Sequence, residues 1–258
     1  MKIEKAIYLN SFNFHKVGKE NRSFSRIYFG NEFCENLTPE VNELKNIFKI
    51  IEKKSINFSF VTPWSTDRGI KKLEKIFDFL PKNTEIIFND WGVFQLIKMN
   101  NSRKKKEFKP ILGRLLVKYQ KDPRIFKSKN KKLINYLKIS NINNEKFQKF
   151  LLKNKIYRVE IENSYQGYNF NLNKNIETSL YYPFVYTATG TKCLFKPNDD
   201  LPYCSRECQK GYFDCSFGKF HILRRGNTEF YVNKKKSGST FFKKLNVSRE
   251  VFSPDLPL

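Results

Sequence analysis

The sequence lacks any apolar run of the roughly 18–20 residues that a membrane-spanning helix requires. The stretch Met1–Ser23 also lacks the apolar segment of a secretory signal peptide. Both absences predict a cytoplasmic protein, where thiols stay reduced and grouped cysteines bind metal more often than they form disulfides. The cysteine count of 5 is odd, which fits poorly with a complete set of disulfides.

Histidine is scarce, with only His15 and His221 in 258 residues. The chain also contains neither a Gly-x-Ser-x-Gly nucleophile elbow nor a His-Glu-x-x-His metal helix. The sequence therefore offers few residues for a hydrolase whose mechanism depends on histidine. A peptidase-like hydrolase with a structural metal remains an alternative function.

Acidic residues are few relative to basic ones: 25 Asp and Glu face 49 Lys and Arg, for a net charge of +24. Such a charge favours RNA or another polyanion as a partner, and the basic runs 100–109 and 233–244 could follow a phosphate backbone. The richness in Lys, Asn, Ile and Phe is equally the signature of an AT-rich genome, which would make the charge compositional. Both interpretations stay open.

The chain alternates short apolar runs with amphipathic stretches, which is the pattern of repeated βα units. We expect one domain over 1–258, a TIM-type (β/α) barrel, complete or incomplete, because about six or seven strands can be counted. Its core spans about 24–232, a basic tail covers 233–258, and a Cys-rich segment lies near the C-terminal face. The expected strands are 24–30, 56–64, 84–90, 109–119, 155–163 and 178–190, with a late hairpin turning at Gly226–Asn227.

Four of the cysteines crowd into one short segment: Cys193, Cys204, Cys208 and Cys215. Thiolates at this density suit zinc or an iron–sulfur cluster, and polar neighbours argue against ordinary buried thiols. A zinc ribbon uses two close pairs where this chain has one, so zinc is the alternative rather than the first choice. Spacing alone favours Cys215 as the fourth ligand. Cys34, after the first expected strand, can also reach the group if strand-end loops meet on one face of a barrel.

Several segments, in this order along the chain, resemble the collagenase-like peptidase family U-32. They are "IYFGNEFC", "VTPWSTDRG", "IIFNDWGVFQL", "LGRLLVK", "RVEIEN", "SLYYPFVYTATGTKC" and "RRGNTEFY", spread over about 24–231. The resemblance implies a TIM-type barrel with a [4Fe-4S] cluster held by four cysteines near its mouth. It also implies a link to oxygen-independent hydroxylation of RNA bases or of a quinone ring, in some members with prephenate as oxygen donor.

The resemblance implies a ligand set of Cys34, Cys193, Cys204 and Cys208, which leaves Cys215 outside and differs from the choice by spacing. It also implies a partner protein of the same family. One family signature is absent: no acidic residue and His-Gly precede Cys193, where the chain reads "VYTATGTK". This departure puts proteolysis in doubt.

Polar residues at strand ends are the usual working groups of a barrel. They supply four catalytic candidates: Asp90, Arg114, Glu160 and Glu162. Alternation places Glu160 and Glu162 on one strand face, where they could act as acid, base or orienting groups. Arg114 lies in an apolar stretch and needs a partner or a bound anion, with Asp90 or Glu160 as the expected partner. The structural alternatives are that Asp90 caps a helix and that the glutamates pair with lysines.

We therefore expect a [4Fe-4S]-binding barrel protein that acts in or assists oxygen-independent hydroxylation or modification of RNA or of an aromatic, quinone-type substrate. Two alternatives stand beside it: the peptidase-like hydrolase, and a nucleic-acid-binding module stabilised by zinc. Cluster binding alone does not decide between an enzyme and an accessory component.

Overall fold

Eight parallel strands close into a barrel in the computed structural model, which describes residues 3–18, 23–123, 125, 128–196, 204–215, 221–235 and 238–258. The strand order around the barrel is β1-β12-β7-β6-β5-β4-β3-β2. These strands are β1 (Glu4–Leu9), β2 (Arg26–Gly30), β3 (Asn57–Val61), β4 (Glu85–Phe88), β5 (Lys109–Leu112), β6 (Arg158–Glu162), β7 (Glu177–Tyr182) and β12 (Val247–Phe252).

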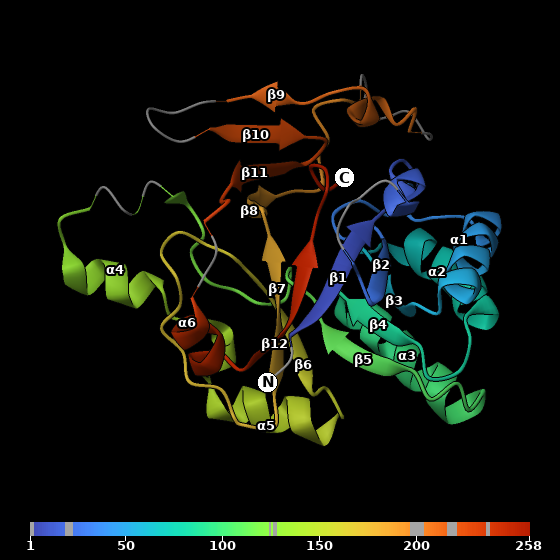
Figure 1. Cartoon of the computed structure of the whole chain (residues 1–258), viewed down its shortest axis with the longest axis horizontal. Helices are drawn as coiled ribbons and strands as arrows, with labels where there is room; N and C mark the ends of the chain where they lie inside the picture. The colour runs from blue at the N-terminus through green and yellow to red at the C-terminus, as the bar shows by residue number, and fades with distance from the viewer. Residues whose placement is uncertain are drawn as a thin grey trace.

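Helices surround the barrel, and a second sheet lies across one end of it (Figure 1). The helices are α1 (Val41–Lys54), α2 (Asp67–Phe79), α3 (Trp91–Arg103), α4 (Lys131–Leu137), α5 (Glu145–Lys153) and α6 (Ser239–Lys244). The second sheet has the order β8-β11-β10-β9 and is antiparallel. Its strands are β8 (Phe184–Thr189), β9 (Phe213–Asp214), β10 (Ile222–Arg225) and β11 (Thr228–Val232).

Period-two alternation in the strands separates an outer core from the barrel interior. On β2, Ile27 and Phe29 join the large apolar cluster that includes the inward faces of the helices, whereas Tyr28 belongs to a separate cluster with Tyr8 and Tyr181. The interior is therefore partly polar. A central layer of apolar and tyrosine side chains separates charged side chains at the amino-terminal end of the barrel from those at the carboxyl-terminal end. This arrangement decides which residues can reach the mouth.

The TIM-type α/β barrel expected from the sequence is confirmed, and it is complete. Two strands lie outside the expected core of 24–232: β1 precedes it, and β12 lies in the segment expected to be a basic tail. The two pair in parallel, Glu4 with Arg249 through Ile7 with Phe252, and this pairing closes the barrel.

Two local expectations need correction. The single strand expected over 178–190 is divided at Pro183 into β7, which stays in the barrel, and β8, which starts the second sheet. The sequence of 37–54 predicts a helix with Thr38 as its N-cap, whereas α1 begins at Val41 with Glu40 at its N-cap. Glu40 and Glu43 form a reciprocal capping box there, which satisfies two backbone N–H groups that would otherwise lack partners.

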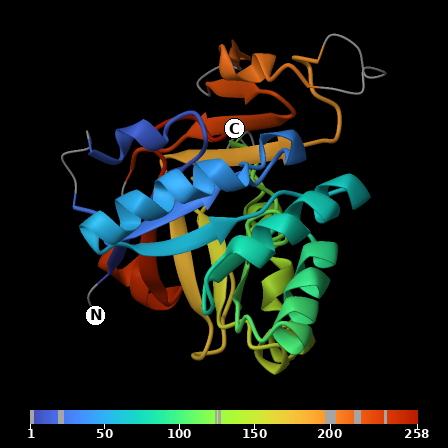
Figure 2. The same cartoon turned by 90° about the vertical axis from the view of Figure 1, so that its right-hand side faces the viewer.

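The Cys-rich segment forms part of the cover over the C-terminal ends of the barrel strands, as Figure 2 shows from the side. The hairpin expected around Gly226–Asn227 is confirmed, since β10 and β11 pair from Arg225 with Thr228 outward. Gly226 has a positive φ of 58°, which glycine adopts without strain. None of the helices in the described part of the chain is both long and apolar enough to cross a membrane.

Candidate functional site at the mouth of the barrel

Cys34 is held at the mouth by the loop that leaves β2. The Asn31 side chain accepts hydrogen bonds from the backbone N–H groups of Phe33 (3.0 Å) and Cys34 (2.9 Å). This turn fixes Cys34 just before a short 3₁₀ helix, Glu35–Leu37. Cys34 therefore occupies a defined position beside the covering sheet rather than a free loop.

The Gly226–Asn227 turn ties the loop after β2 to the late cysteine segment. The Asn227 amide nitrogen donates to the carbonyl oxygens of Phe33 (2.8 Å) and Gly190 (2.6 Å). The backbone N–H of Leu194 donates to the carbonyl of Gly226 (3.4 Å). Because Phe33 precedes Cys34 and Leu194 follows Cys193, one two-residue turn positions both cysteines.

Gly226 lies beside two of the cysteines. A Cβ atom at this position would lie 3.5 Å from the Cβ of Cys208, 3.8 Å from the sulfur of Cys193 and 3.4 Å from a Leu258 methyl group. These are ordinary van der Waals distances, so a Cβ would touch the cysteines without displacing them. Glycine is favoured here by the positive φ of the turn.

The Cys34 thiol lies close enough to three other thiols for their charges to affect its pKa. Burial, with smaller contributions from the neighbouring Cys208, Cys204 and Cys193, raises the pKa of the Cys34 thiol to about 11. Burial likewise raises the pKa of Cys208, again with contributions from Cys193 and Cys204. The structure thus brings Cys34, Cys193, Cys204 and Cys208 together from segments far apart in the sequence.

Cys215 stands apart from this group. It is exposed, follows the outermost strand β9, and donates its backbone N–H to Ile222 (2.7 Å). Among the described residues, no three His, Cys, Asp or Glu side chains are grouped tightly enough to hold a metal ion. A [4Fe-4S] cluster binds its thiolates at the corners of a cube instead of around one central ion, so its ligands stand further apart.

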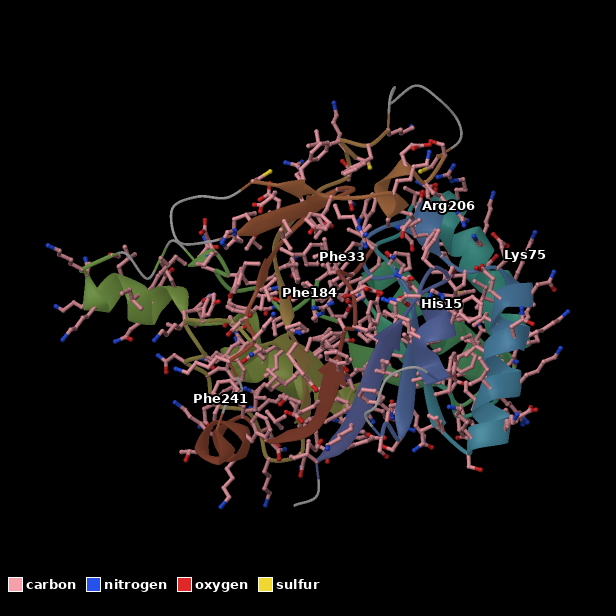
Figure 3. The ribbon with its side chains drawn as sticks, turned by 45° about the horizontal axis from the view of Figure 1, so that its top comes forward. His15, Phe33, Lys75, Phe184, Arg206 and Phe241 are labelled. Carbon is pink, nitrogen blue, oxygen red and sulfur yellow. The ribbon has the colours of Figure 1, made fainter. Side chains whose placement is uncertain are left out.

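Apolar side chains pack against two of the thiols. Cys208 is buried in a cluster with Phe33, Tyr186 and Phe230, and Cys34 packs against the same cluster. In Figure 3, Phe33 and Phe184 lie between the barrel and the covering sheet, while Arg206, two residues before Cys208, lies at the edge of that sheet. Thiol donors in an apolar, partly enclosed setting are a chemical match to an iron–sulfur cluster.

Beneath this cover, Arg114 forms a buried ion-pair network. It lies in the turn after β5, not within the strand as expected, and its guanidinium contacts Glu32 (Nε–Oε2 3.1 Å) and Glu162 (Nη1–Oε1 3.2 Å). The expected partners Asp90 and Glu160 are therefore wrong. Burial opposes its charge, but Glu32 and Glu162 hold the pKa of Arg114 above its usual value, so it stays protonated.

Aromatic rings seal this network from the mouth. The Arg114 guanidinium carbon lies 3.9 Å from the ring centre of Tyr181 and 5.4 Å from that of Phe33. The Lys121 ammonium lies 3.2 Å from a Glu162 oxygen and 3.4 Å from the ring centre of Tyr186. Burial lowers the pKa of Lys121 to about 8, against the opposing effect of Glu162. The network supports the floor of the mouth without opening onto it.

The four catalytic candidates occupy different environments. Glu160 and Glu162 point inward as expected and are fully buried; burial raises the pKa of Glu160 to about 8 and raises that of Glu162 as well. Asp90 caps α3 by accepting from the N–H groups of Gly92 (2.7 Å) and Val93 (3.3 Å). Asp90 lines the cavity described next, whereas Arg114, Glu160 and Glu162 do not.

A cavity of about 370 Å³ opens at the mouth next to the Cys34 loop. We call it the mouth cavity. Its walls come from the segments that follow β2, β3, β4 and β5 and from the end of β8, the positions where βα-barrel active sites are built. The lining residues are Phe33, Trp64, Asn89, Asp90, Trp91, Leu115, Leu116, Lys118, Thr189, Gly190 and Thr191.

Sequence reasoning missed Glu32, Lys118 and Lys121. Glu32 follows β2 in "FGNEFC", so the strand-end rule that selected Asp90 and Glu162 would have selected it too. Lys118 and Lys121 carry no local signal, because lysine is abundant throughout the chain and only the fold separates these two from the rest.

Comparison with known proteins gives one structural likeness. The chain is similar to the U32 peptidase Mk0906, with a TM-score of 0.48 and 8% sequence identity, over 100% of this chain and 95% of that one. No protein-family model matches the sequence. No curated protein matches it either.

Proposed function

We propose that the protein holds a [4Fe-4S] cluster through Cys34, Cys193, Cys204 and Cys208, and that it acts in or assists an oxygen-independent hydroxylation of an aromatic substrate or an RNA base. The observation that supports the proposal is that Cys34, Cys193 and Cys208 gather around one turn at the barrel mouth, with Cys204 within electrostatic range of Cys34. When bound, such a cluster supplies one-electron transfer.

Several residues hold the segments that carry these cysteines in place. Asn227 and Asn31 fix the backbone around Cys34, and Gly226 lies beside Cys193 and Cys208. The Arg225 guanidinium donates to the carbonyl oxygens of Leu256 (2.8 Å) and Leu258 (3.5 Å), which holds the C-terminal segment against the same apolar cluster. This packing excludes water from one side of the thiols.

RNA as the substrate or partner remains a prediction from charge. In the basic run 100–109, Lys104 already pairs with Asp78, and the Lys106 ammonium donates to the carbonyl oxygens of Asp78 and Leu80 (both 2.7 Å). These lysines help fasten the turn after α3. The aromatic mouth cavity therefore favours a compact aromatic ring over an extended backbone as the group that reacts.

The test is iron, acid-labile sulfide and zinc content of anaerobically purified protein, in the parent chain and in Cys34→Ser, Cys208→Ser and Cys215→Ser. We expect about four iron and four sulfide per chain in the parent and in Cys215→Ser, and a large loss in the other two. Cys215→Ser is the matched control because it removes an exposed thiol of the same segment.

Two results would overturn the proposal: zinc without sulfide in the parent protein, or unchanged iron in Cys34→Ser. A Gly226→Val variant adds an independent readout. Valine is strained at the positive φ of this turn and would extend beyond a Cβ that already touches Cys193 and Cys208, so we expect reduced cluster content although every thiol is retained.

A further inference from the structure

The mouth cavity combines a size, a shape and a lining that are typical of small-molecule sites. Its volume of about 370 Å³ falls within the range of roughly 300–1,000 Å³ that such sites span. Its wall is largely apolar, and Asn89, its buried amide, is already satisfied by Thr62 (2.9 Å) and Leu115 (3.0 Å). The groups left to meet a ligand are therefore aromatic faces and a few charges.

Both tryptophans of the chain line this cavity and are exposed to an unusual degree. Trp64 is 43% exposed and Trp91 is 41% exposed. Trp91 is braced edge-on by Phe94, Phe147 and Phe150, with ring centres 5.8–6.2 Å away. An indole that is held rigidly and left open offers a preformed stacking surface for a flat ring.

Lys118 supplies a cation at the rim. Partial burial lowers the pKa of its ammonium, and none of the acidic side chains in the described part of the chain forms an ion pair with it. Asp90 lines the same cavity. The Asp90 carboxylate is held by the backbone N–H groups of Gly92 and Val93, so Lys118 is the charged group available to a single carboxylate of a ligand.

The cavity adjoins the cysteines through shared backbone. Phe33 and Gly190 form part of its wall, and the Asn227 amide binds the carbonyl oxygens of both. Cys34 follows Phe33 directly, and Thr191, also in the wall, precedes Cys193 by two residues. A ligand in the cavity would thus lie beside the thiol group.

We propose that the mouth cavity binds a single-ring aromatic acid, with the ring against Trp64 and Trp91 and the carboxylate toward Lys118. This inference rests on the proposed function for the role of the ligand as the group to be modified. The binding itself depends only on the cavity, so it can be tested on metal-free protein.

Tryptophan fluorescence tests it directly, because the chain's only two tryptophans both line the site. We would titrate full-length protein, purified anaerobically and also stripped of metal, with 4-hydroxyphenylacetate. Saturable quenching is expected, and it should be stronger than with its neutral counterpart tyrosol or with the non-aromatic acid cyclohexylacetate. Lys118→Met should weaken binding about tenfold, which corresponds to the loss of one modest charge interaction.

Lys75→Met is the matched control, since Lys75 lies on the outer side of α2, away from the mouth (Figure 3). Calorimetric titration of Trp91→Ala, which retains Trp64, should show weaker binding of the acid without loss of the fold. The proposal is overturned if quenching does not saturate, if Lys118→Met and Lys75→Met behave alike, or if uridine 5′-monophosphate binds more tightly than the acid. Cysteine variants without metal should still bind the acid, so failure here and failure of the cluster assay are separate results.

Discussion

The two ends of the barrel interior both contain arginine–glutamate networks, built in different ways. At the amino-terminal end, Arg26 and Arg249 share Glu4 and Glu85 in a closed set of contacts of 2.6–3.1 Å. Each carboxylate there has two arginine partners. The side chains of Glu4 and Glu85 keep 24% and 17% of their surface exposed, so water reaches this network.

At the mouth, one arginine serves two carboxylates in a dry environment. Arg114 contacts both Glu32 and Glu162, and all three side chains are at most 1% exposed. Of these two carboxylates, Lys121 contacts Glu162 (3.2 Å). The amino-terminal network therefore has a spare partner for each charge, whereas the network at the mouth depends on Arg114.

The difference follows the general division of labour in βα barrels, in which the amino-terminal end stabilises the fold and the carboxyl-terminal end carries the site. Arg114, whose burial costs desolvation free energy, packs against Phe33. Phe33 forms part of the wall of the mouth cavity and precedes Cys34. At the amino-terminal end each carboxylate has two arginine partners, as expected of a network that stabilises the fold.

The largest effect should come from Arg114→Ala. Its removal leaves Glu32 and Glu162 buried without their main partner, and a broken buried pair of this kind costs about 3–5 kcal/mol. Urea unfolding would measure the loss. Arg249→Ala is the comparison, and about 2 kcal/mol is expected because Arg26 still serves Glu4 and Glu85. Equal losses of unfolding free energy in Arg114→Ala and Arg249→Ala would show that the two networks do not differ in their dependence on one arginine.

A smaller change in stability is expected for Glu160→Gln, and it is an increase rather than a loss. Glu160 lies between the networks; it accepts from the Tyr28 hydroxyl (3.2 Å), and its second oxygen has no hydrogen-bond partner. Burial raises its pKa from 4.5 to about 8, so the folded state retains a proton that the unfolded chain loses as pH rises from 4.5. Its contribution to stability therefore falls between pH 4.5 and 8. Glu160→Gln should be more stable than the parent by roughly 3 kcal/mol at pH 9, with little difference at pH 4.

Thermal melts across this pH range would check the Glu160 prediction. Glu52→Gln, a change at an exposed position of α1, serves as the control and should leave the profile of the parent unchanged. A gain for Glu160→Gln that is the same at pH 4 and pH 9 would show that folding does not raise the pKa of the Glu160 carboxyl group.

The smallest effect concerns Glu85 in acid. Burial alone would raise its pKa, but Arg249 and Arg26 lower it from 4.5 to about 2. The stability that Glu85 contributes is thus present above pH 4.5 and is lost as pH falls toward 2. Glu85→Gln should cost on the order of 2 kcal/mol at pH 7 and should flatten the acid limb of the stability profile, measured by urea unfolding. An unchanged acid limb would contradict this account of the amino-terminal network.

Much of the barrel could be predicted because its βα units carry strong local signals. The runs around Ile27, Phe60 and Ile87 read as strands, and each precedes an amphipathic helix. The closing strands could not be recognised in the same way. β12 reads "VSREVF", where Arg249 suggests a surface, and only the fold shows that Arg249 points inward to Glu4 and Glu85.

The candidate site was predictable in composition but not in geometry. The cysteines could be selected by type and spacing, and the resemblance implied Cys34 as a ligand beside Cys208; in the structure Cys34 packs against the apolar cluster that contains Cys208. The pairing of Arg114 depends on the loop after β2 folding back over the barrel, which no local pattern records. The position of Gly226 beside Cys193 and Cys208 is likewise a property of packing, since the sequence shows only a turn.

The pairing of β1 with β12 has a consequence for the order of assembly. Residues 4–7 pair with residues 249–252, so most of the barrel and its covering sheet lie between the two partners along the chain. The contact between β1 and β12 therefore cannot form until the ribosome has made the segment between them, which includes the covering sheet between β7 and β12. The edges of β1 and β7 are exposed throughout that interval, which makes a nascent barrel dependent on rapid closure to avoid pairing with other chains.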